Sequence, residues 1–204
     1  MFRVVNFTYL LRYVAILTTF LSILAYIGVE HLMQNDVPII RLLSVAPWVV
    51  MLVVLAITTN TTSRVIWKIL RAFNSSLYPD LNGAWEGEIT LESGVKIPAR
   101  AVIRQNLIQA QIDLHTETSK STTLETTPVI DAGQYKLYYT YRSTPSNVDW
   151  SPYTGSTILD VRNAVKNADC VLELSGFYYT DRKTNGRISL RQTSPKADVD
   201  VSYY

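Results

Sequence analysis

Residues 170–192 read CVLELSGFYYTDRKTNGRISLRQ, which is the pattern of a β-hairpin. Apolar and polar residues alternate on both sides of the Lys-Thr-Asn-Gly segment at 183–186, which is typical of a turn. In a strand, alternate side chains share one face. The inward face of the first strand then contains, in order, Leu172, Leu174, Gly176, Tyr178, Thr180 and Arg182. This face is aliphatic at its start and becomes aromatic and polar toward its end.

The same alternation recurs in six stretches that precede the hairpin, and turn signals separate most of them, one of them at 143–147. Together they predict eight short strands, at residues 85–91, 95–105, 107–116, 120–126, 135–142, 155–161, 170–180 and 186–192. Eight strands with mostly short links predict an antiparallel up-and-down β-barrel, which has no open edge and encloses room for side chains or one small ligand. A β-sandwich is the competing architecture.

Two other predicted strands change from aliphatic to polar in the same way. Their inward residues are Ile112, Leu114 and Thr116 in one, and Leu137, Tyr139 and Tyr141 in the other. Buried hydroxyls need hydrogen-bonding partners, and a fixed guanidinium needs an anion or several acceptors. Such a pocket suits a small anionic ligand with flat rings.

The alternation leaves two points open. It does not say whether these strand ends meet at one mouth, because the register between strands is not visible in the sequence. Tyrosines are also common core residues of strands, and Asp181 and Arg182 fit an ordinary surface ion pair.

The N-terminal part contains two long uncharged runs, at 13–29 and 42–63. A helix that crosses about 30 Å of hydrocarbon needs about 17–25 residues, because it rises about 1.5 Å per residue. Arg12 can extend to the headgroups, so the first helix is expected to begin near residue 9. We therefore predict a hairpin of two transmembrane helices and a juxtamembrane helix at 66–73, all within residues 1–76. Residues 77–204 form the predicted β-domain.

Basic residues predict the orientation of this hairpin. Arg3 and Arg12 precede the first helix, whereas Arg64, Lys68 and Arg71 follow the second. The loop between the helices has one arginine and two acidic residues. The positive-inside rule therefore places both termini and the β-domain in the cytoplasm of a two-pass membrane protein. A single cysteine agrees with that reducing compartment.

Neither uncharged run has an ionisable residue in its middle, which argues against a pump or a proton-coupled transporter. Thr18, Ser22 and Tyr26 recur every four residues in the first run, and such spacing permits close helix packing. They pack either against the second helix or against another copy of the chain, and the sequence leaves both open.

The composition excludes several other classes. One cysteine and two distant histidines, His31 and His115, provide no disulfide, no metal site and no nucleophile–histidine pair. The acidic residues form no recognisable catalytic pair, and no glycine-rich phosphate loop is present, so we expect no enzyme, no catalytic residue and no cofactor. Residues 73–204 carry thirteen basic and fifteen acidic groups, so DNA and RNA polymers are not expected partners.

Several segments, in this order, carry a family resemblance. After the apolar hairpin and its short basic linker come LNGAWEG (81–87), IRQ (103–105), the polar residues Thr116, Ser119 and Ser121, LYYTY (137–141), YTG (153–155) and LSGFYYTDRKTNG (174–186). In this combination the chain resembles the two-transmembrane, β-strand-rich effectors of bacterial CBASS antiphage defence. The likeness extends over essentially the whole chain, although a segment such as LNGAWEG also opens lipocalin-like barrels.

The resemblance implies a function. A partner nucleotidyltransferase makes a cyclic dinucleotide second messenger, and the cytoplasmic barrel binds it. Binding then drives self-association in the bacterial inner membrane, where disruption of the lipid bilayer leads to abortive infection.

The resemblance also implies which residues contact the ligand. They are Tyr139, Tyr141, Tyr178, Thr180 and Arg182, with Thr116 and Ser121 behind them. Arg182 would pair with phosphate, and the tyrosines would stack or form hydrogen bonds. Trp85 is expected to close the other end of the barrel, as in other barrels that begin with this motif.

Two different functions remain as alternatives. A membrane-tethered, lipocalin-like carrier of a small apolar ligand would have a pocket that is aliphatic throughout, with Arg182 outside it. A scaffold that holds a partner at the membrane is also compatible with the sequence.

Overall fold

The computed structural model describes residues 7–33, 42–73, 77–166 and 169–203. They form two compact units, a helical one within Val5–Ser75 and a β-sheet one within Ser76–Tyr204. Arg3 and the loop at 34–41, on which the predicted orientation partly depends, lie outside the described residues. Residue 76, at the predicted domain boundary, also lies outside them.

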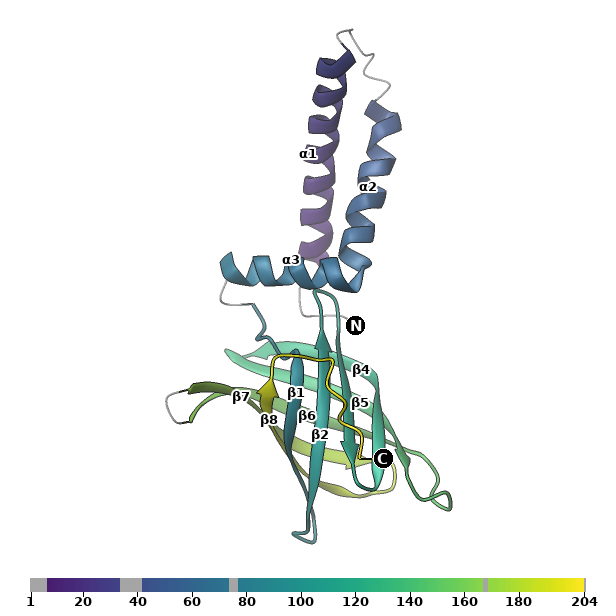
Figure 1. Cartoon of the computed structure of the whole chain (residues 1–204), viewed down its shortest axis with the longest axis vertical. Helices are drawn as coiled ribbons and strands as arrows, with labels where there is room; N and C mark the ends of the chain where they lie inside the picture. Colours follow the sequence, from purple (N-terminus) through teal and green to yellow (C-terminus); the bar gives the residue numbers. More distant parts are fainter. Residues whose placement is uncertain (1–6, 34–41, 74–76, 167–168, 204) are drawn as a thin grey trace. The chain divides into compact units, whose positions relative to one another are not determined.

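The β unit is a closed antiparallel barrel of eight strands, in which each strand pairs with the next and β8 pairs with β1 (Figure 1). The strands are β1 (Gly83–Leu91), β2 (Lys96–Gln105), β3 (Ala110–Thr116), β4 (Ser119–Asp131), β5 (Gln134–Pro145), β6 (Tyr153–Lys166), β7 (Asp169–Thr180) and β8 (Asn185–Ser194). Gly94 and Gly133 adopt positive φ angles of 83° and 78°, which the short turns after β1 and β4 require. The predicted eight-stranded antiparallel barrel is confirmed, and the sandwich is excluded.

Four strand ends differ from the prediction by three residues or more: β3 begins later than predicted, and β4, β5 and β6 end later, at Asp131, Pro145 and Lys166. Two of these differences have a local reason. The third strand begins at Ala110 and not at 107, because the Asn106 side-chain oxygen accepts the N–H groups of residues 108 and 109 at 2.8 Å and holds a turn there. The fifth strand continues to Pro145, so the turn predicted at 143–147 begins later. Ser143 is consequently a fully buried strand residue.

The interior follows the predicted alternation: the inward residues of β3 and β5 are buried, as are Leu174, Gly176 and Tyr178 of β7, whereas Leu172 and Thr180 are half-buried. At the end of the barrel where β1 begins, Trp85 is completely buried, and its indole N–H donates to the Leu81 carbonyl at 2.9 Å. Leu81, Ile103 and Leu107 are buried at the same end. This end is therefore filled by side chains, as predicted for Trp85.

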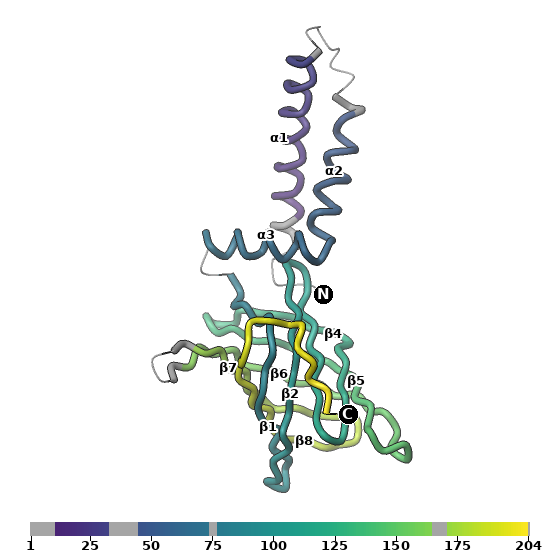
Figure 2. Tube along the Cα trace, in the orientation of Figure 1, coloured from purple at the N-terminus to yellow at the C-terminus, as the bar shows by residue number. Residues whose placement is uncertain are grey.

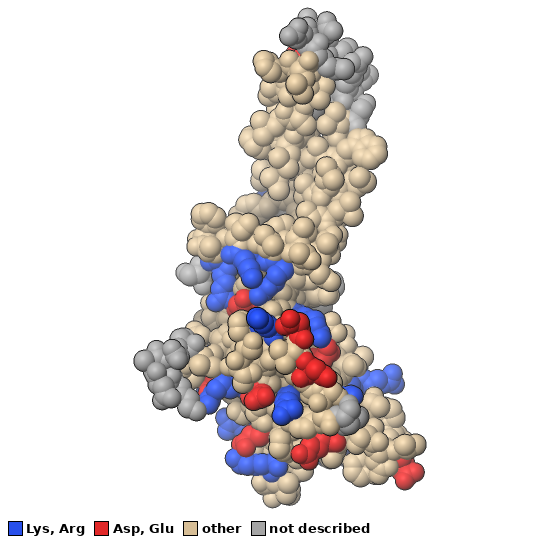
Figure 3. All heavy atoms as spheres, viewed as in Figure 1, with Lys and Arg blue, Asp and Glu red and all other residues tan. Residues whose placement is uncertain are grey.

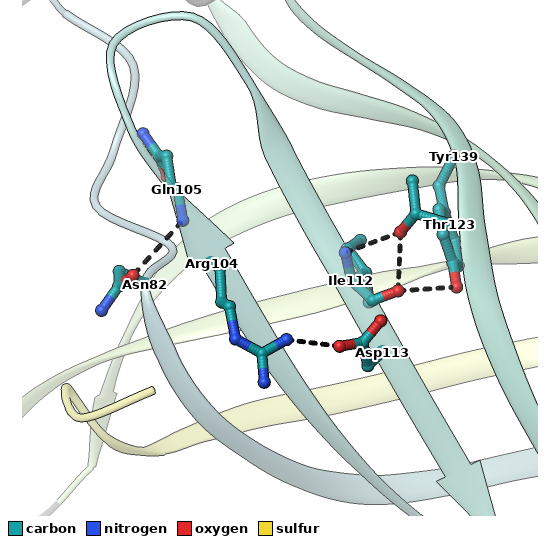
Figure 4. Close-up of polar contacts among 7 residues, drawn as sticks. All are labelled: Asn82, Arg104, Gln105, Ile112, Asp113, Thr123 and Tyr139. Carbon is teal, nitrogen blue, oxygen red and sulfur yellow. Dashed lines mark hydrogen bonds and ion pairs between the residues drawn. The ribbon is translucent and has the colours of Figure 1, made fainter. Parts of the chain in front are cut away.

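The seam between β3 and β4 is built differently from the rest of the wall (Figure 4). Among the described residues, its backbone register consists of Leu114 with Ser121 and His115 with Lys120. Beyond these pairs the Thr123 hydroxyl donates to the Ile112 carbonyl at 2.6 Å and accepts the Ile112 N–H at 2.7 Å. The Thr126 hydroxyl donates in the same way to the carbonyl of Ala110. Threonine side chains thus replace part of the ladder, next to a bulge between Thr123 and Glu125.

The segment after β8 returns along the outside of the barrel beside β2 (Figure 2). Val201 is buried, and the Arg100 guanidinium lies 4.7 Å from the centre of the Tyr203 ring. Val102 faces outward yet has an exposed fraction of only 1%, and it borders the same groove as Val201. The C-terminal segment therefore covers an apolar patch that the strand alternation would leave exposed.

The helical unit contains α1 (Phe7–Met33), α2 (Leu42–Thr58) and α3 (Asn60–Phe73). Among the residues that the structure describes, one helix is by itself long and apolar enough to cross a membrane: its segment Leu11–Leu32 has 22 residues and a mean hydropathy of 1.7, and α2 and α3 qualify only together, as a bent pair. The second predicted span is shorter than expected, because α2 ends at Thr58 and the chain bends by 84° into α3. Polar residues fill positions 58–62, and the Thr62 hydroxyl donates to the Ala56 carbonyl at 2.5 Å. Such local bonds compete with a continuous helix.

The residues predicted to form a juxtamembrane helix are helical, but the helix begins at Asn60 and not at residue 66. On α1, Thr18 and Ser22 are buried, and their hydroxyls donate to carbonyls of their own helix, those of Ala15 and Thr18, at 3.0 and 2.7 Å. Their burial agrees with packing inside one chain.

Candidate ligand-binding site

Five of the predicted site residues meet at one mouth of the barrel. In this topology odd-numbered strands end, and even-numbered strands begin, at the same end of the sheet. Thr116 ends β3, Ser121 is near the start of β4, Tyr139 and Tyr141 are in the second half of β5, and Tyr178 is near the end of β7. The alternation in the sequence identified which side chains of each strand face inward, and the closed topology brings these strand ends together.

A cavity of about 150 Å³ lies at this mouth, and all five residues line it. Its aliphatic walls come from Ile89, Leu91, Ile97, Leu114 and Ile188. The remaining lining side chains, all from tyrosine, threonine or serine, carry hydroxyls. The cavity is therefore neither filled by side chains nor aliphatic throughout, and no charged residue is among those that line it in the described chain.

The tyrosine rings form the aromatic wall. The rings of Tyr139 and Tyr141 stack with centres 5.0 Å apart and an angle of 29° between their planes. Burial raises the pKa of the Tyr139, Tyr141 and Tyr178 hydroxyls above the ordinary value of 10, and the nearby Tyr153 raises those of Tyr141 and Tyr178 further. These phenols stay protonated at neutral pH and can donate hydrogen bonds to an anion.

Two glycines make room for these rings. Gly155 lies opposite Tyr141 in the register of β5 and β6, and a Cβ built on it would overlap the far end of the Tyr141 ring. Gly186 lies opposite Tyr178 in the register of β7 and β8. A Cβ there would lie 2.7 Å from Tyr178 Cε1 and closer still to the carbonyl oxygen of Thr90. Each tyrosine ring therefore occupies the space that a side chain at Gly155 or Gly186 would fill.

The hydroxyl groups of the site differ in how they are used. Thr116 Oγ1 holds the turn after β3, since it accepts the N–H of Ser119 at 3.0 Å and lies 3.1 Å from Ser119 Oγ. Within the described part of the chain, the hydroxyls of Ser121, Tyr141 and Tyr178 have no hydrogen-bonding partner. Ser143, opposite Ser121 in the register, is fully buried with an unpaired hydroxyl among the described atoms. The free donors that line the cavity therefore come from β4, β5 and β7, and Ser143 lies behind them.

Thr180 and Arg182 lie at the rim and do not line the cavity. Arg182 is exposed, its guanidinium carbon is 4.5 Å from the centre of the Tyr153 ring, and one of its N–H groups donates to the Ser151 carbonyl. Thr180 Oγ1 lies 2.7 Å from Thr184 Oγ1 within the turn between β7 and β8. Tyr153 does line the cavity, so the Tyr153 ring lies between the Arg182 guanidinium and the cavity.

Asp181 does not form the surface ion pair with Arg182 that was one alternative for these two residues. Its carboxylate instead accepts the Thr154 N–H at 2.9 Å. That bond ties the turn after β7 to the start of β6, next to the mouth of the cavity.

Tyr153, Gly155 and Gly186 were not among the predicted site residues. The motif segments quoted above contain all three, but at positions expected to be turns or strand starts. Their role depends on which residue lies opposite, and that is not visible before the register is known. Among the described residues, no group of three or more histidine, cysteine or acidic side chains could hold a metal ion.

The β-domain matches a known protein family. Residues 76–192 match the family model described as "Cap15, cyclic dinucleotide receptor domain". This segment covers more than half of the chain and includes every strand up to most of β8. No curated protein matches the chain.

Proposed function

Because the chain belongs to the Cap15 cyclic dinucleotide receptor family, we propose that it is a CBASS effector that a cyclic dinucleotide activates at the bacterial inner membrane. One observation carries the proposal. The matched segment forms a closed barrel, and the cavity at its mouth is lined by protonated tyrosines and free hydroxyls. A carrier of apolar ligands would not need these donors, because they cost free energy when buried without a partner.

The size of the cavity indicates how such a ligand sits. Ligand pockets usually have volumes of about 300–1,000 Å³, and this cavity has about 150 Å³. We propose that one base enters and stacks on the tyrosine rings, which contributes about 1–3 kcal/mol per base. The phosphates stay at the rim, where the phenols of Tyr141 and Tyr178 donate hydrogen bonds and Arg182 turns from Tyr153 toward the anion.

The helical unit supplies the membrane part of the proposal. α1 and α2 cross the bilayer as a two-pass hairpin, with both termini and residues 77–204 in the cytoplasm. Ligand binding favours an assembled state in which several hairpins together disrupt the bilayer, and the chain itself catalyses no reaction. A shift from about 1:99 to 99:1 between the two states needs about 5.5 kcal/mol of differential affinity.

Binding and assembly can be tested together on the full-length chain in detergent. Titration calorimetry with a panel of cyclic dinucleotides should show one that binds, and light scattering should show an increase in mass when it is present. An unchanged monomer with no bound nucleotide would refute the proposal. Displacement of a bound fatty acid, without nucleotide binding, would support the apolar-carrier alternative.

Neighbouring tyrosines of β7 provide a matched control. Tyr178 faces the cavity with an exposed fraction of 6%, whereas Tyr179 faces outward with 62%. Tyr178→Phe should weaken nucleotide binding, and Tyr179→Phe should not. Equal effects of the two changes would show that the ligand does not occupy the cavity.

Membrane disruption needs its own assay. The full-length chain, reconstituted into vesicles that contain a fluorescent dye, should release the dye only when the nucleotide is added. Tyr178→Phe should raise the nucleotide concentration required. Nucleotide binding without dye release would leave the receptor role intact and refute the disruption.

A further inference from the structure

The helix α3 separates its charged and apolar residues into two faces. Arg64, Lys68 and Arg71 are spaced four and three residues apart and share one face. In the sequence of α3 there is no acidic residue. Figure 3 shows lysine and arginine side chains gathered along α3, whereas α1 and α2 present an almost uncharged surface. The charged face is therefore purely cationic.

The other face of α3 is apolar and exposed. Val65, Ile69 and Phe73 recur every four residues, and their exposed fractions are 51%, 53% and 88%. At 3.6 residues per turn the centres of the two faces are about 130° apart. Trp67 is buried on the side of α3 away from the apolar face, about 160° from its centre. The guanidinium carbons of Arg64 and Arg71 lie 4.8 and 5.3 Å from its ring centre. Exposed apolar side chains at this spacing require a partner surface.

The preceding helix identifies that surface. α2 has no charged residue, and α3 begins two residues after α2 ends, at an angle of 84° to it. If α2 crosses the bilayer, α3 runs parallel to the membrane plane. A straight continuation would leave the bilayer, since Val65 would lie about 35 Å along the helix from Leu42, and hydrocarbon is about 30 Å thick. The apolar face of α3 would then be exposed to water. A basic amphipathic helix in the interface instead buries its apolar face beneath the headgroups and keeps its cations at their level.

We infer that α3 is an interfacial helix that binds anionic phospholipid, with Val65, Ile69 and Phe73 inserted and Lys68 at the headgroups. This inference rests on the proposed membrane anchoring by α1 and α2. Arg64 and Arg71 hold Trp67, so Lys68 is the cation most exposed to lipid. Each basic residue near an anionic surface contributes about 1 kcal/mol.

Because the chain has one cysteine, a single new cysteine can be labelled to measure how deep α3 lies in the bilayer. In a Cys170→Ser background that still binds the nucleotide, Ile69→Cys carries an environment-sensitive fluorophore on the apolar face. Asn60→Cys is the matched control about 180° from Ile69 on α3, and Ile23→Cys reports on the middle of α1. The full-length chain is reconstituted into phosphatidylcholine vesicles, with or without phosphatidylglycerol, that contain nitroxide lipids labelled at a shallow or a deep position.

The inference predicts that the shallow nitroxide quenches the label at 69 more strongly than the deep one does. The shallow nitroxide should also quench the label at 69 more strongly than the label at 60. Phosphatidylglycerol should increase this quenching, and Lys68→Glu should remove the increase. Suppose that the deep nitroxide quenches the label at 23 but neither nitroxide quenches the label at 69. Protein would then cover the apolar face of α3, and the result would overturn this inference but not the membrane anchoring. Deep quenching at 69 would also overturn the inference. No quenching at 23 would overturn the membrane anchoring and the inference together.

Discussion

Replacing Gly155 by alanine should reduce nucleotide affinity without unfolding the barrel. The added Cβ overlaps the end of the Tyr141 ring, and a ring can rotate away where a backbone atom cannot. Tyr141 would then leave its stack on Tyr139, where the ring centres are 5.0 Å apart. The aromatic wall of the cavity would lose one of its faces.

The expected free-energy changes distinguish an effect on folding from an effect on nucleotide binding. Alanine stabilises a strand by about 0.5–1 kcal/mol relative to glycine, and the lost ring pair costs about 0.5–1.5 kcal/mol. These nearly offset each other, so the melting temperature should change by less than about 5 °C. A base that loses one stacking partner loses about 1–3 kcal/mol, which corresponds to about 5- to 150-fold weaker binding.

A double-mutant cycle checks the reasoning. Calorimetry should show that Gly155→Ala weakens binding in the parent chain and adds little in a Tyr141→Ala background, because both changes act through one ring. Gly176→Ala is the control for a steric change elsewhere, since its Cβ would overlap the carbonyl oxygen of Ile158 and should lower the melting temperature markedly. Unchanged affinity of Gly155→Ala, or independent effects in the cycle, would refute the assignment.

Three further predictions concern single side chains. Tyr141→Phe should leave thermal stability nearly unchanged and weaken nucleotide binding about tenfold or more in calorimetry, because it removes one donor to a charged group. Arg182→Ala should give a folded barrel that binds nucleotide weakly and with less dependence on salt; retained affinity at low salt would exclude Arg182 from the site. Burial, with Lys120 nearby, holds the pKa of His115 below its ordinary value of 6.5, so the unfolded chain binds this proton more readily. Urea unfolding should therefore show stability that is complete above pH 6.5 and declines as the pH falls through the folded-state pKa, and His115→Asn should reduce that decline.

The sequence predicted the barrel because each strand has one apolar face, and a closed sheet buries all of them. It predicted the inward tyrosines of β5 and β7 for the same reason. It placed the start of β3 too early, since a single side-chain turn at Asn106 overrides the apolar pattern at 107–109. It placed the end of the second long helix too late, because an uncharged run of threonines looks like a span although its hydroxyls compete for the backbone.

The candidate site was predictable only in part. Alternation shows which side chains face inward, so five residues were found. Arg182 follows the same alternation, but it lies in a turn, where the period of two no longer determines direction. Tyr141 lies opposite Gly155, and Tyr178 opposite Gly186, because of the register between strands. The sequence of one strand does not specify how far the neighbouring strand is shifted along it.

The threonine-bridged seam implies that the cylinder is not equally rigid around its circumference. A hydroxyl bridge opens by the rotation of one side chain, whereas a backbone ladder opens only when two strands separate. Amide protons of β3 beside Thr123 and Thr126 should therefore exchange with deuterium sooner than those of β6 and β7. The Tyr139 hydroxyl donates to the same Ile112 carbonyl that Thr123 bonds, at 3.3 Å, so occupancy of the cavity should alter deuterium uptake there first. Uniform protection of all eight strands, with and without nucleotide, would contradict this.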